Sequence, residues 1–427
     1  MSTPKPLAAD AVAAAPTHWT DRLAVGGPEL VDYQDSISPS YFELEREAVF
    51  RRNWLMIGRD GDLKSPGSYF TKELEVLKTS LLVVRGKDAK IRSFHNVCPH
   101  RGNKLVWEED PRKETQGRSL LFRCKYHGLG FDSNGDLRVL SDPESWSGSQ
   151  GRDLHLAEVP TEVWNGFIFV NFTPGGPRQR LQDHLGDFYW HGFDDYPFAK
   201  FTERVSLRAT GKGNWKLMLD ALSEGFHVFG LHTPFFPPSF GKMDGGAPKF
   251  RALHYELHGK HRASLAGRIP EGVFGYRIET AAQATGGGPR HPMSIAMPDL
   301  PPAANPIAAQ DWGTSLNAIW PNWMFQIFYP GWYMTFTLWP LAYNETRVEA
   351  DWYLAPPRNF SELWSQQVSL SLFVDAALQD VSTLGAMQQG LESNAFASYP
   401  LTDEEVLVRH LHRMVREEVA AFTQRGG

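Results

Sequence analysis

Two histidines near the middle of the chain stand where a helix is predicted to end. His227 and His232 are five residues apart, so an unbroken α-helix would turn their side chains about 140° away from each other. Gly230 and the pair Thr233-Pro234 predict that the helix loosens or stops between or just after them. Two imidazoles brought together across a helix end are half of a metal site.

The residues before these histidines add carboxylates to the same helical face. Asp220, Glu224 and His227 fall at positions i, i+4 and i+7 of a predicted helix over 214–230, so they share one face. A buried carboxylate or imidazole must be paired or bound to a metal. Burial is predicted from the apolar neighbours Trp215, Met218, Leu222, Phe226 and Phe229.

Both cysteines of the protein have a histidine close behind them. The pattern is Cys98-x-His100, then 23 residues, then Cys124-x-x-His127, so each pair fits in one tight loop. Two thiolates and two neutral imidazoles would hold a tetrahedral Zn²⁺. The alternative is a [2Fe–2S] cluster, with both cysteines on one iron and both histidines on the other, although zinc is the usual interpretation of a generic Cys₂His₂ set. Two cysteines do not make a disulfide framework, and in the cytosol they are expected to be free or metal-bound.

A third candidate metal ligand lies near the C-terminus. An amphipathic helix is predicted over 362–391, and Asp380 belongs to its apolar stripe, whereas Asp375 lies on another face. A carboxylate in that position is either salt-bridged or a ligand. With His227 and His232 it would complete a two-histidine, one-carboxylate set, which holds iron(II) by one face and leaves positions open for O₂. The apolar stripe consists of Phe373, Ala377, Leu384, Met387 and Leu391.

The cysteine loops resemble a known family in detail. The segments 96–102 and 124–128, followed by Phe131-Asp132 and 134–137, resemble the two loops of a Rieske iron–sulfur domain. The resemblance implies a [2Fe–2S] cluster on Cys98, His100, Cys124 and His127, in preference to zinc. Two departures touch no ligand and leave an intact cluster expected. Leu129-Gly130-Phe131 replaces the usual Trp-x-Tyr or Trp-x-Phe, and a charged insertion occupies 108–114.

The C-terminal segment extends this resemblance to a whole class of enzymes. Gln379-Asp380 with 388–393 resembles the ligand-bearing segment of Rieske non-haem iron, aromatic-ring-hydroxylating oxygenases, and the likeness to their catalytic (α) subunit covers 38–420. It implies an α+β chain with an all-β Rieske domain and a helix-grip (START-like) catalytic domain containing an antiparallel sheet. It also implies mononuclear Fe(II) on His227, His232 and Asp380.

Members of this family form rings of three subunits in which a carboxylate links the two metal centres of neighbouring chains. Matched by position, Glu224 would join His227 to His127 of the next subunit, although the family usually has Asp there. A residue in this position fixes the tautomer of a ligand and offers a short electron path. Asp220 would be an accessory partner or a structural acid, and Asn214 matches a position near the iron.

The rest of the chain supplies the elements that must position these residues. It has 427 residues, of which 42% are hydrophobic and 22% charged, enough for two ordinary globular domains. The net charge of −6 gives no reason to expect a nucleic acid or a membrane as a partner. No window of 18 apolar residues is present, and the N-terminus lacks the apolar core of a signal peptide, so a cytoplasmic protein is expected.

The expected order of the chain follows from composition and periodicity. Four units are predicted: a flexible arm over 1–37, a helix over 38–54 with Ser40 as a candidate N-cap, the Rieske domain over 55–173 and the catalytic domain over 174–427. Within the last unit, residues 176–200 are predicted to be a connecting segment and 203–209 a strand. Residues 234–310 are predicted to form long loops, and 318–355 antiparallel strands rich in aromatic residues. Histidines His95, His254, His258 and His261 are predicted to be surface or core residues, and the polar face of a last helix accounts for His410 and His412.

Together these features predict a terminal oxygenase that hydroxylates, and in the first instance dihydroxylates, an aromatic or other bulky hydrophobic substrate. Monooxygenation or oxidative demethylation is the alternative, followed by a pure Rieske electron carrier and a zinc-stabilised binding protein. No Gly-rich dinucleotide motif follows a predicted strand, so a ferredoxin and/or an NAD(P)H-dependent reductase is the expected electron donor, with O₂ as co-substrate. A homotrimer is expected, with or without a small β subunit. Aromatic side chains that suggest the substrate pocket, and that would equally fill a core, are Phe235, Phe236, Phe240, Trp320, Trp323, Met324, Phe325 and Phe328.

Overall fold

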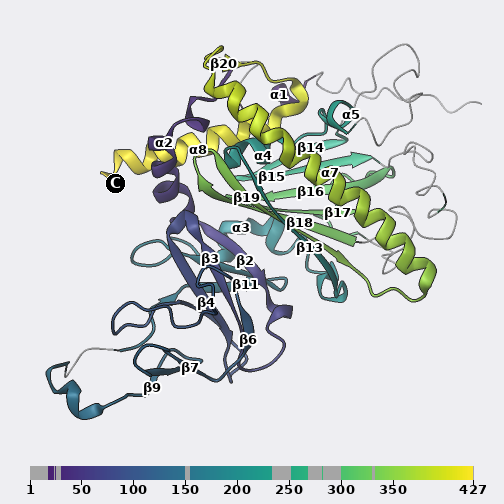
Figure 1. Ribbon diagram of the computed structural model, residues 1–427. Helices are drawn as coiled ribbons and strands as arrows, with labels where there is room; N and C mark the ends of the chain where they lie inside the picture. The colour runs from purple at the N-terminus through teal and green to yellow at the C-terminus, as the bar shows by residue number, and fades with distance from the viewer. Residues whose placement is uncertain are drawn as a thin grey trace, which may run out of the picture.

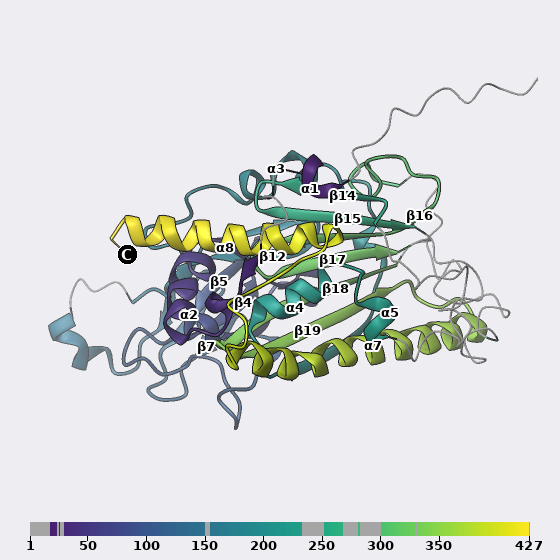
Figure 2. The same cartoon turned by 90° about the horizontal axis from the view of Figure 1, so that it is seen from above.

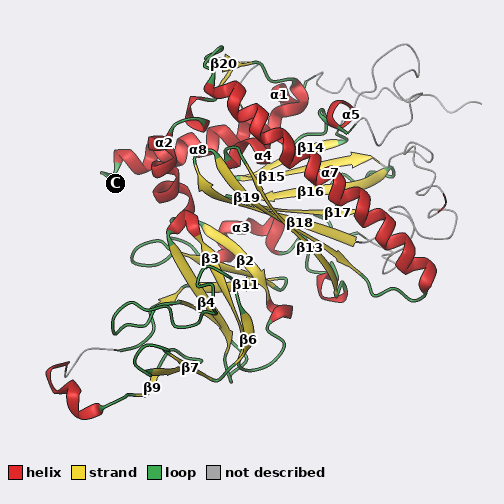
Figure 3. Cartoon of the chain, viewed as in Figure 1, coloured by secondary structure: helices red, strands yellow, loops and turns green. Residues whose placement is uncertain are grey.

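Two lobes share the chain, one built from short strands and one from a broad sheet covered by helices (Figure 1). The computed structural model describes residues 18–23, 25, 30–149, 154–232, 252–267, 281, 300–328 and 332–426. Figure 3 shows the division of secondary structure, with every long helix in the lobe that carries the broad sheet. No helix in these ranges is long and apolar enough to cross a bilayer.

The smaller lobe consists of three antiparallel sheets, in the orders β10-β5-β4-β3-β6, β11-β12-β2 and β7-β8-β9. The central strand β4 explains how this lobe holds two cores. Its alternate residues point to opposite faces, so Leu81 and Val83 join the main core while Leu82 and Val84 join a small core with both cysteines. The strands are β2 Trp54–Arg59, β3 Ser68–Leu74, β4 Thr79–Arg85, β5 Ile91–His95, β6 Gln116–Arg118, β7 Leu121–Arg123, β8 Gly130–Asp132, β9 Leu137–Val139, β10 Glu158–Val159, β11 Thr161–Trp164 and β12 Phe167–Asn171.

The larger lobe is organised around a seven-stranded antiparallel sheet with the order β13-β19-β18-β17-β16-β15-β14. The aromatic strands predicted over 318–355 form its centre, which confirms the antiparallel sheet and the α+β class. Every residue of β18 from 332 to 340 is buried, because helices cover this part of the sheet. The strands are β13 Glu203–Gly211, β14 His254–His258, β15 His261–Gly267, β16 Trp312–Ile319, β17 Trp323–Phe328, β18 Trp332–Ala342 and β19 Glu345–Leu354.

Three helices gather over one face of this sheet, with α4 (Trp215–Leu222) between α7 (Phe360–Glu392) and α8 (Val406–Gln424), as Figure 2 shows. The short α5 (Val228–Leu231) follows α4. The remaining described elements are α1 Trp19–Arg22, α2 Pro39–Glu45, α3 Leu181–Trp190, β1 Val31–Asp32, β20 Ser398–Tyr399, the π-helix η2 Arg46–Phe50 and the 3₁₀ turns η1 Gln34–Ser36, η3 Asp60–Asp62, η4 Glu75–Leu77, η5 Pro143–Ser149, η6 Phe198–Lys200 and η9 Asp403–Glu405.

The predicted helix over 38–54 begins where expected, but its predicted N-cap and its predicted end are wrong. Ser38, not Ser40, is the N-cap: its Oγ accepts a hydrogen bond from the backbone N–H of Tyr41 at 3.2 Å, and Pro39 takes the first helical position. The helix widens into η2, and Trp54 already begins strand β2. Trp54 pairs with Asn171 at the far end of β12, so the small lobe uses the residue assigned to the helix.

Two segments predicted as connections or loops contain regular elements. Helix α3 lies within 176–200. Gly186 interrupts its helical backbone with a φ of 67°, so the apolar residues before and after it do not follow one continuous helical period. Strands β14 and β15 lie within 234–310 and form the edge of the large sheet. Their histidines and charged residues hid the apolar alternation from the sequence pattern.

The entry to α4 is anchored by a fully buried ion pair. Lys216 on α4 and Glu45 on α2 form a salt bridge, and both side chains are 0% exposed. Glu45 also accepts a hydrogen bond from the indole N–H of Trp215 at 2.9 Å. Burial raises the pKa of Glu45, while Lys216 and Trp215 oppose that shift by stabilising the carboxylate.

We expect Lys216→Met to destabilise the protein by about 3–5 kcal/mol, because it leaves the Glu45 carboxylate buried without its counter-ion. Urea unfolding followed by tryptophan fluorescence measures the change. Lys212→Met is the matched control, since Lys212 is exposed and its pair with Glu345 is worth only about 0–1 kcal/mol. Equal effects of the two substitutions would contradict this assignment.

Candidate metal centres

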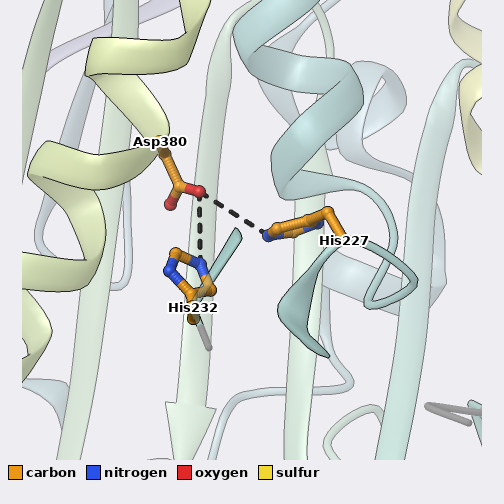
Figure 4. Close-up of side chains that lie close together, drawn as sticks. All are labelled: His227, His232 and Asp380. Carbon is orange, nitrogen blue, oxygen red and sulfur yellow. Dashed lines mark ion pairs between the residues drawn. The ribbon is translucent and has the colours of Figure 1, made fainter. Parts of the chain in front are cut away.

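Three side chains predicted as metal ligands converge in the large lobe. His227 precedes α5, His232 follows it and Asp380 projects from the middle of α7. One ligand atom from each lies within 4.8 Å of the others. The Asp380 Oδ1 is 3.6 Å from the His227 Nε2 and 3.3 Å from the His232 Nε2, as the dashed lines of Figure 4 mark. The structure therefore brings together the set expected to hold a metal.

The local backbone differs from the predicted continuous helix. Helix α4 ends at Leu222, with Ser223 as its C-cap, and the residues from Glu224 to His227 form a turn. Glu224 and His227 thus do not share a helical face with Asp220. The four residues of α5 then turn the chain so that the histidines at its two ends have ring centroids 5.3 Å apart.

Each histidine is held by a second side chain through its other ring nitrogen. The His227 Nδ1 donates to the Glu224 Oε1 at 2.7 Å, and the His232 Nδ1 donates to the Gln379 Oε1 at 2.9 Å. These bonds place the Nδ1 proton and direct each Nε2 toward Asp380. Metal-binding histidines have this arrangement because a hydrogen bond at one nitrogen orients the ring and raises the basicity of the other.

The carboxylate itself fits a cation. Asp380 is 7% exposed, and its Oδ1 has no hydrogen-bond partner among the described residues. A buried carboxylate oxygen is costly unless it is hydrogen-bonded, paired or bound to a metal. Burial lowers the pKa of His232, but the nearby Asp380 carboxylate and the hydrogen bond with Gln379 outweigh it, so the pKa is raised overall. Two imidazoles and one carboxylate suit iron(II).

The second centre lies at the end of the small lobe, in two loops with the same backbone pattern. In each loop the cysteine C=O accepts from the glycine N–H four residues on, Gly102 or Gly128, at 3.0 Å. Both glycines have a positive φ, 75° and 78°, which other residues adopt at a cost. The loops are therefore two copies of one tight turn, which begin at Cys98 and Cys124.

The four predicted cluster ligands meet as a pair of thiols and a pair of imidazoles. Cys98 and Cys124 are both 2% exposed and form no disulfide. Burial raises the pKa of the Cys98 thiol, and the neighbouring Cys124 raises it further. The rings of His100 and His127 lie 4.6 Å apart. This separation into two sulfur and two nitrogen donors fits a [2Fe–2S] cluster with a different pair on each iron.

Two weaker site predictions receive structural explanations instead. Asn214 is the N-cap of α4: its Oδ1 accepts from the Lys216 N–H at 3.0 Å and its Nδ2 donates to the Tyr343 C=O at 2.7 Å. Asp220 is absent from the metal-ligand group. Its Oδ2 accepts from the Tyr33 hydroxyl at 3.2 Å and from the His412 Nε2 at 3.0 Å.

The same contact corrects the prediction for the last helix. His410 and His412 are each 1% exposed, so α8 buries the face that was predicted to be polar. His412 is partnered by Asp220, and Asp35 lies 3.9 Å from its other ring nitrogen. Spacing along one helix could not indicate this, because both carboxylates come from other parts of the chain.

Of the residues predicted to line a substrate pocket, those that the structure describes do not lie at the cavity beside the metal ligands. Trp320, Trp323, Met324 and Phe325 are core residues of at most 2% exposure, and Phe328 stacks on Trp332. Phe235, Phe236 and Phe240 are outside the described residues. The cavity that touches His227 and Asp380 has a volume of about 600 Å³ and opens between α4, α7, β20 and the start of α8.

Gln379 is the functional candidate that sequence reasoning missed. It was visible beside Asp380, but only the folded structure shows that it reaches the His232 ring. We expect Gln379→Leu to weaken iron binding about 10- to 100-fold, because His232 loses the acceptor that orients it. Iron retained after dialysis against a chelator measures this. Gln367→Leu, an exposed position on the same helix, should retain iron as the wild type does.

The two centres are far apart within one chain. Figure 1 places β7 and β9, beside the second cysteine loop, at the outer end of the small lobe, away from α5 and α7. In Figure 2, too, β7 lies well apart from α5. No described side chain from the small lobe lines the cavity at His227.

Comparisons with known proteins match both lobes. Residues 198–421 match the family model of the ring hydroxylating alpha subunit (catalytic domain), and residues 53–151 match that of the Rieske [2Fe-2S] domain. The large oxygenase component of a naphthalene 1,2-dioxygenase system from Ralstonia sp. is 34% identical over 198 residues, 45% of this chain and 42% of that protein. The carnitine monooxygenase oxygenase subunit of Escherichia coli (strain K12) is 29% identical over 195 residues, 45% of this chain and 50% of that protein. The chain thus spans about half the length or less of these curated relatives.

Solved structures support the fold along the whole chain. A quaternary ammonium Rieske monooxygenase in complex with L-carnitine superposes with a TM-score of 0.69 at 17% identity, covering 92% of this chain and 97% of that one. Naphthalene 1,2-dioxygenase from Rhodococcus sp. bound to indole gives a TM-score of 0.67 at 17% identity, covering 92% and 94%. At these identities the likeness establishes the architecture alone.

Proposed function

This chain belongs to the Rieske-type ring-hydroxylating oxygenase α subunits, and we propose that it is the terminal component of an oxygenase that hydroxylates an aromatic or other bulky hydrophobic substrate. The observation that carries the proposal is the convergence of His227, His232 and Asp380 at the end of α4, with both Nε2 atoms turned toward one buried carboxylate oxygen. A pure electron carrier has no use for such a site.

The chain would hold two groups. Cys98, His100, Cys124 and His127 would hold a [2Fe–2S] cluster, and His227, His232 and Asp380 would hold iron(II). When bound, these groups supply single electrons and the O₂ chemistry. The protein keeps the ligand rings oriented through Glu224 and Gln379, buries the carboxylate, and shields the thiols in the small core.

We propose that Glu224 completes a contact between neighbouring copies. Its two oxygens already accept from the His227 Nδ1 and the His227 N–H, at 2.7 and 3.0 Å, and a carboxylate has about four acceptor positions. It therefore retains the capacity to accept from His127 of a second copy. Since the two centres of one chain are far apart, this contact would shorten the path that electrons take, and a homotrimeric ring would repeat it three-fold.

The remaining partners follow from this assignment. A ferredoxin and/or an NAD(P)H-dependent reductase would supply electrons, and O₂ would be the second substrate. The primary proposal is dihydroxylation. Monooxygenation or demethylation is a second candidate because a carnitine monooxygenase subunit is among the relatives. Incubation with ¹⁸O₂ separates the two, since dihydroxylation places two labelled oxygens in the product and monooxygenation places one.

Mixing two inactive variants tests the oxygenase and its assembly together. Cys124→Ser removes a cluster ligand and Asp380→Ala removes an iron ligand, so neither variant alone should turn over substrate. Co-expressed in equal amounts, they should recover about one quarter of wild-type activity, because half of the subunits keep iron and half of these adjoin a neighbour with a cluster. Adding Glu224→Gln to the Cys124→Ser chain should lower that recovery. No recovery in mixed oligomers would contradict transfer between subunits.

A further inference from the structure

Besides the metal-ligand candidate Asp380, the cavity has three carboxylates in otherwise apolar walls. These are Asp220 on α4, Glu224 in the turn after it and Glu405 at the end of η9. A cluster of like charges in such surroundings is unfavourable unless a cation approaches it. The apolar wall is made by Leu217, Leu384, Met387, Leu391, Phe396, Leu401 and Val408.

The carboxylates are only partly neutralised within the described residues: the buried Arg262 lies near enough to Asp220 to interact with its charge, but no described Lys or Arg forms an ion pair with Glu224 or Glu405. Asp220 is 6% exposed, and while its Oδ2 is bonded to Tyr33 and His412, its Oδ1 has no hydrogen-bond partner among the described residues. Burial raises the pKa of Glu405, and the charges of Glu224 and Asp220 raise it further against opposing hydrogen bonds with Thr402. The Asp220 Oδ1 is thus a buried acceptor without a donor among the described residues. The neighbouring Glu405 carboxyl has a pKa raised in part by the negative charges of Glu224 and Asp220.

The opposite charge is displayed beside the cluster loops. Arg101 follows His100 and is exposed, and its guanidinium lies 5.3 Å from the ring centre of Tyr126. The Tyr126 ring, 57% exposed, lies 3.9 Å from the ring of His127. No carboxylate in the described part of the chain lies within ion-pair distance of Arg101. The outer end of the small lobe therefore presents an unpaired cation supported by an exposed aromatic ring, next to a cluster histidine.

We propose that Arg101 of a second copy of this chain enters the cavity and forms an ion pair with Asp220, with Glu405 as the neighbouring acceptor. The inference rests on the proposed function, in which Glu224 meets His127 of that copy. On one surface Tyr126 contacts His127 and Arg101 contacts Tyr126, and on the other Asp220 and Glu405 line the same cavity as Glu224. Arginine suits this site because its planar guanidinium offers five donors and is more weakly hydrated than an ammonium group.

A double-mutant cycle tests the ion pair between Arg101 and Asp220. It uses the full-length protein loaded with the [2Fe–2S] cluster and the mononuclear iron. Arg101→Gln, Asp220→Asn and the double variant are compared for the dissociation constant of the oligomer, measured by sedimentation over a dilution series. Each single substitution should raise the dissociation constant about tenfold or more. The double variant should raise it little further than the single variant with the larger effect. Added salt should weaken the wild type more than Arg101→Gln. Lys87→Gln, at the exposed turn between β4 and β5 in the same lobe, removes equal charge and should have no effect.

Arg101→Gln keeps the test sound if Asp220→Asn proves unstable, because the Arg101 side chain is exposed and, among the described residues, its contact is with the Tyr126 ring. Independent, additive effects of the two substitutions would overturn the proposal, as would association that matches the wild type. The alternative occupant of the cavity is a free metal ion. In that case Mg²⁺ titrated into the separated chains would bind to the wild type and to Arg101→Gln but not to Asp220→Asn. This result would contradict the proposal. Failure of the pair alone leaves recovery of activity in the mixed Cys124→Ser and Asp380→Ala oligomers intact, whereas failure of the proposed function abolishes that recovery.

Discussion

Replacing Asp380 with Ala should remove one iron per chain and nearly all oxygenase activity. The wild type should contain about three irons and two acid-labile sulfides, and the variant about two irons with sulfide unchanged. The expected loss is at least about a thousandfold in product formation, since a catalytic metal supplies several kcal/mol of transition-state stabilisation and about 4 kcal/mol equals a factor of a thousand. Anaerobic metal analysis and product quantification measure both effects.

Asp375→Ala is the matched control for this substitution. Asp375 lies on the same helix but is exposed, and its contact is a long hydrogen bond of 3.5 Å from Gln379. It should retain three irons and activity near that of the wild type. The assignment of the mononuclear site would be wrong if both variants kept the third iron, or if Asp380→Ala lost sulfide along with it.

Replacing Cys124 with Ser should abolish the cluster and, with it, all turnover that depends on external electrons. In the proposed site the thiolate would be one of four ligands, and a hydroxyl is a poor substitute because iron–sulfur clusters require soft sulfur ligands. Sulfide should fall to near zero, and the EPR signal of the reduced cluster should vanish. About one iron should remain at His227, His232 and Asp380, because that site lies in the other lobe.

His95→Gln tests whether this loss is specific to a ligand. His95 ends β5 three residues before Cys98, and its Nδ1 is 2.9 Å from the Thr79 hydroxyl. Sulfide and the EPR signal should survive in this variant. Zinc in place of iron and sulfide in the wild-type protein would contradict the cluster assignment for both loops.

The two cysteine–histidine turns proposed to hold the cluster could be predicted because each pair is local. Cys98 with His100, and Cys124 with His127, need only a tight turn of a few residues, and the glycine four positions after each cysteine supplies the positive φ that the turn requires. Such a turn is encoded almost entirely by neighbouring residues. The same reasoning holds for the apolar strands, whose alternation can be read directly.

The mononuclear site was predicted less completely because it combines local and distant contacts. His227 and His232 were visible from their spacing, but the continuous helix expected through Glu224 ends at Leu222. Asp380 had to be matched by family resemblance, since nothing local distinguishes a ligand from a salt-bridged acid. No role could be predicted for the adjacent Gln379, because its partner His232 is 147 positions away along the chain.

What the sequence determined by itself was the chemistry available: two cysteine–histidine turns, two histidines at a helix end and an antiparallel framework of apolar strands. Only the tertiary structure decided which polar groups share a buried space. It paired His412 with Asp220 and made Asn214 a helix cap. It also buried Trp320, Trp323, Met324 and Phe325 in the core, and it left one buried oxygen of Asp220 without a hydrogen-bond partner among the described residues. The physical reason is that backbone turns depend on neighbours in the chain, whereas the partner of a buried polar group is whichever group the packing of distant helices brings within 3 Å or so of it.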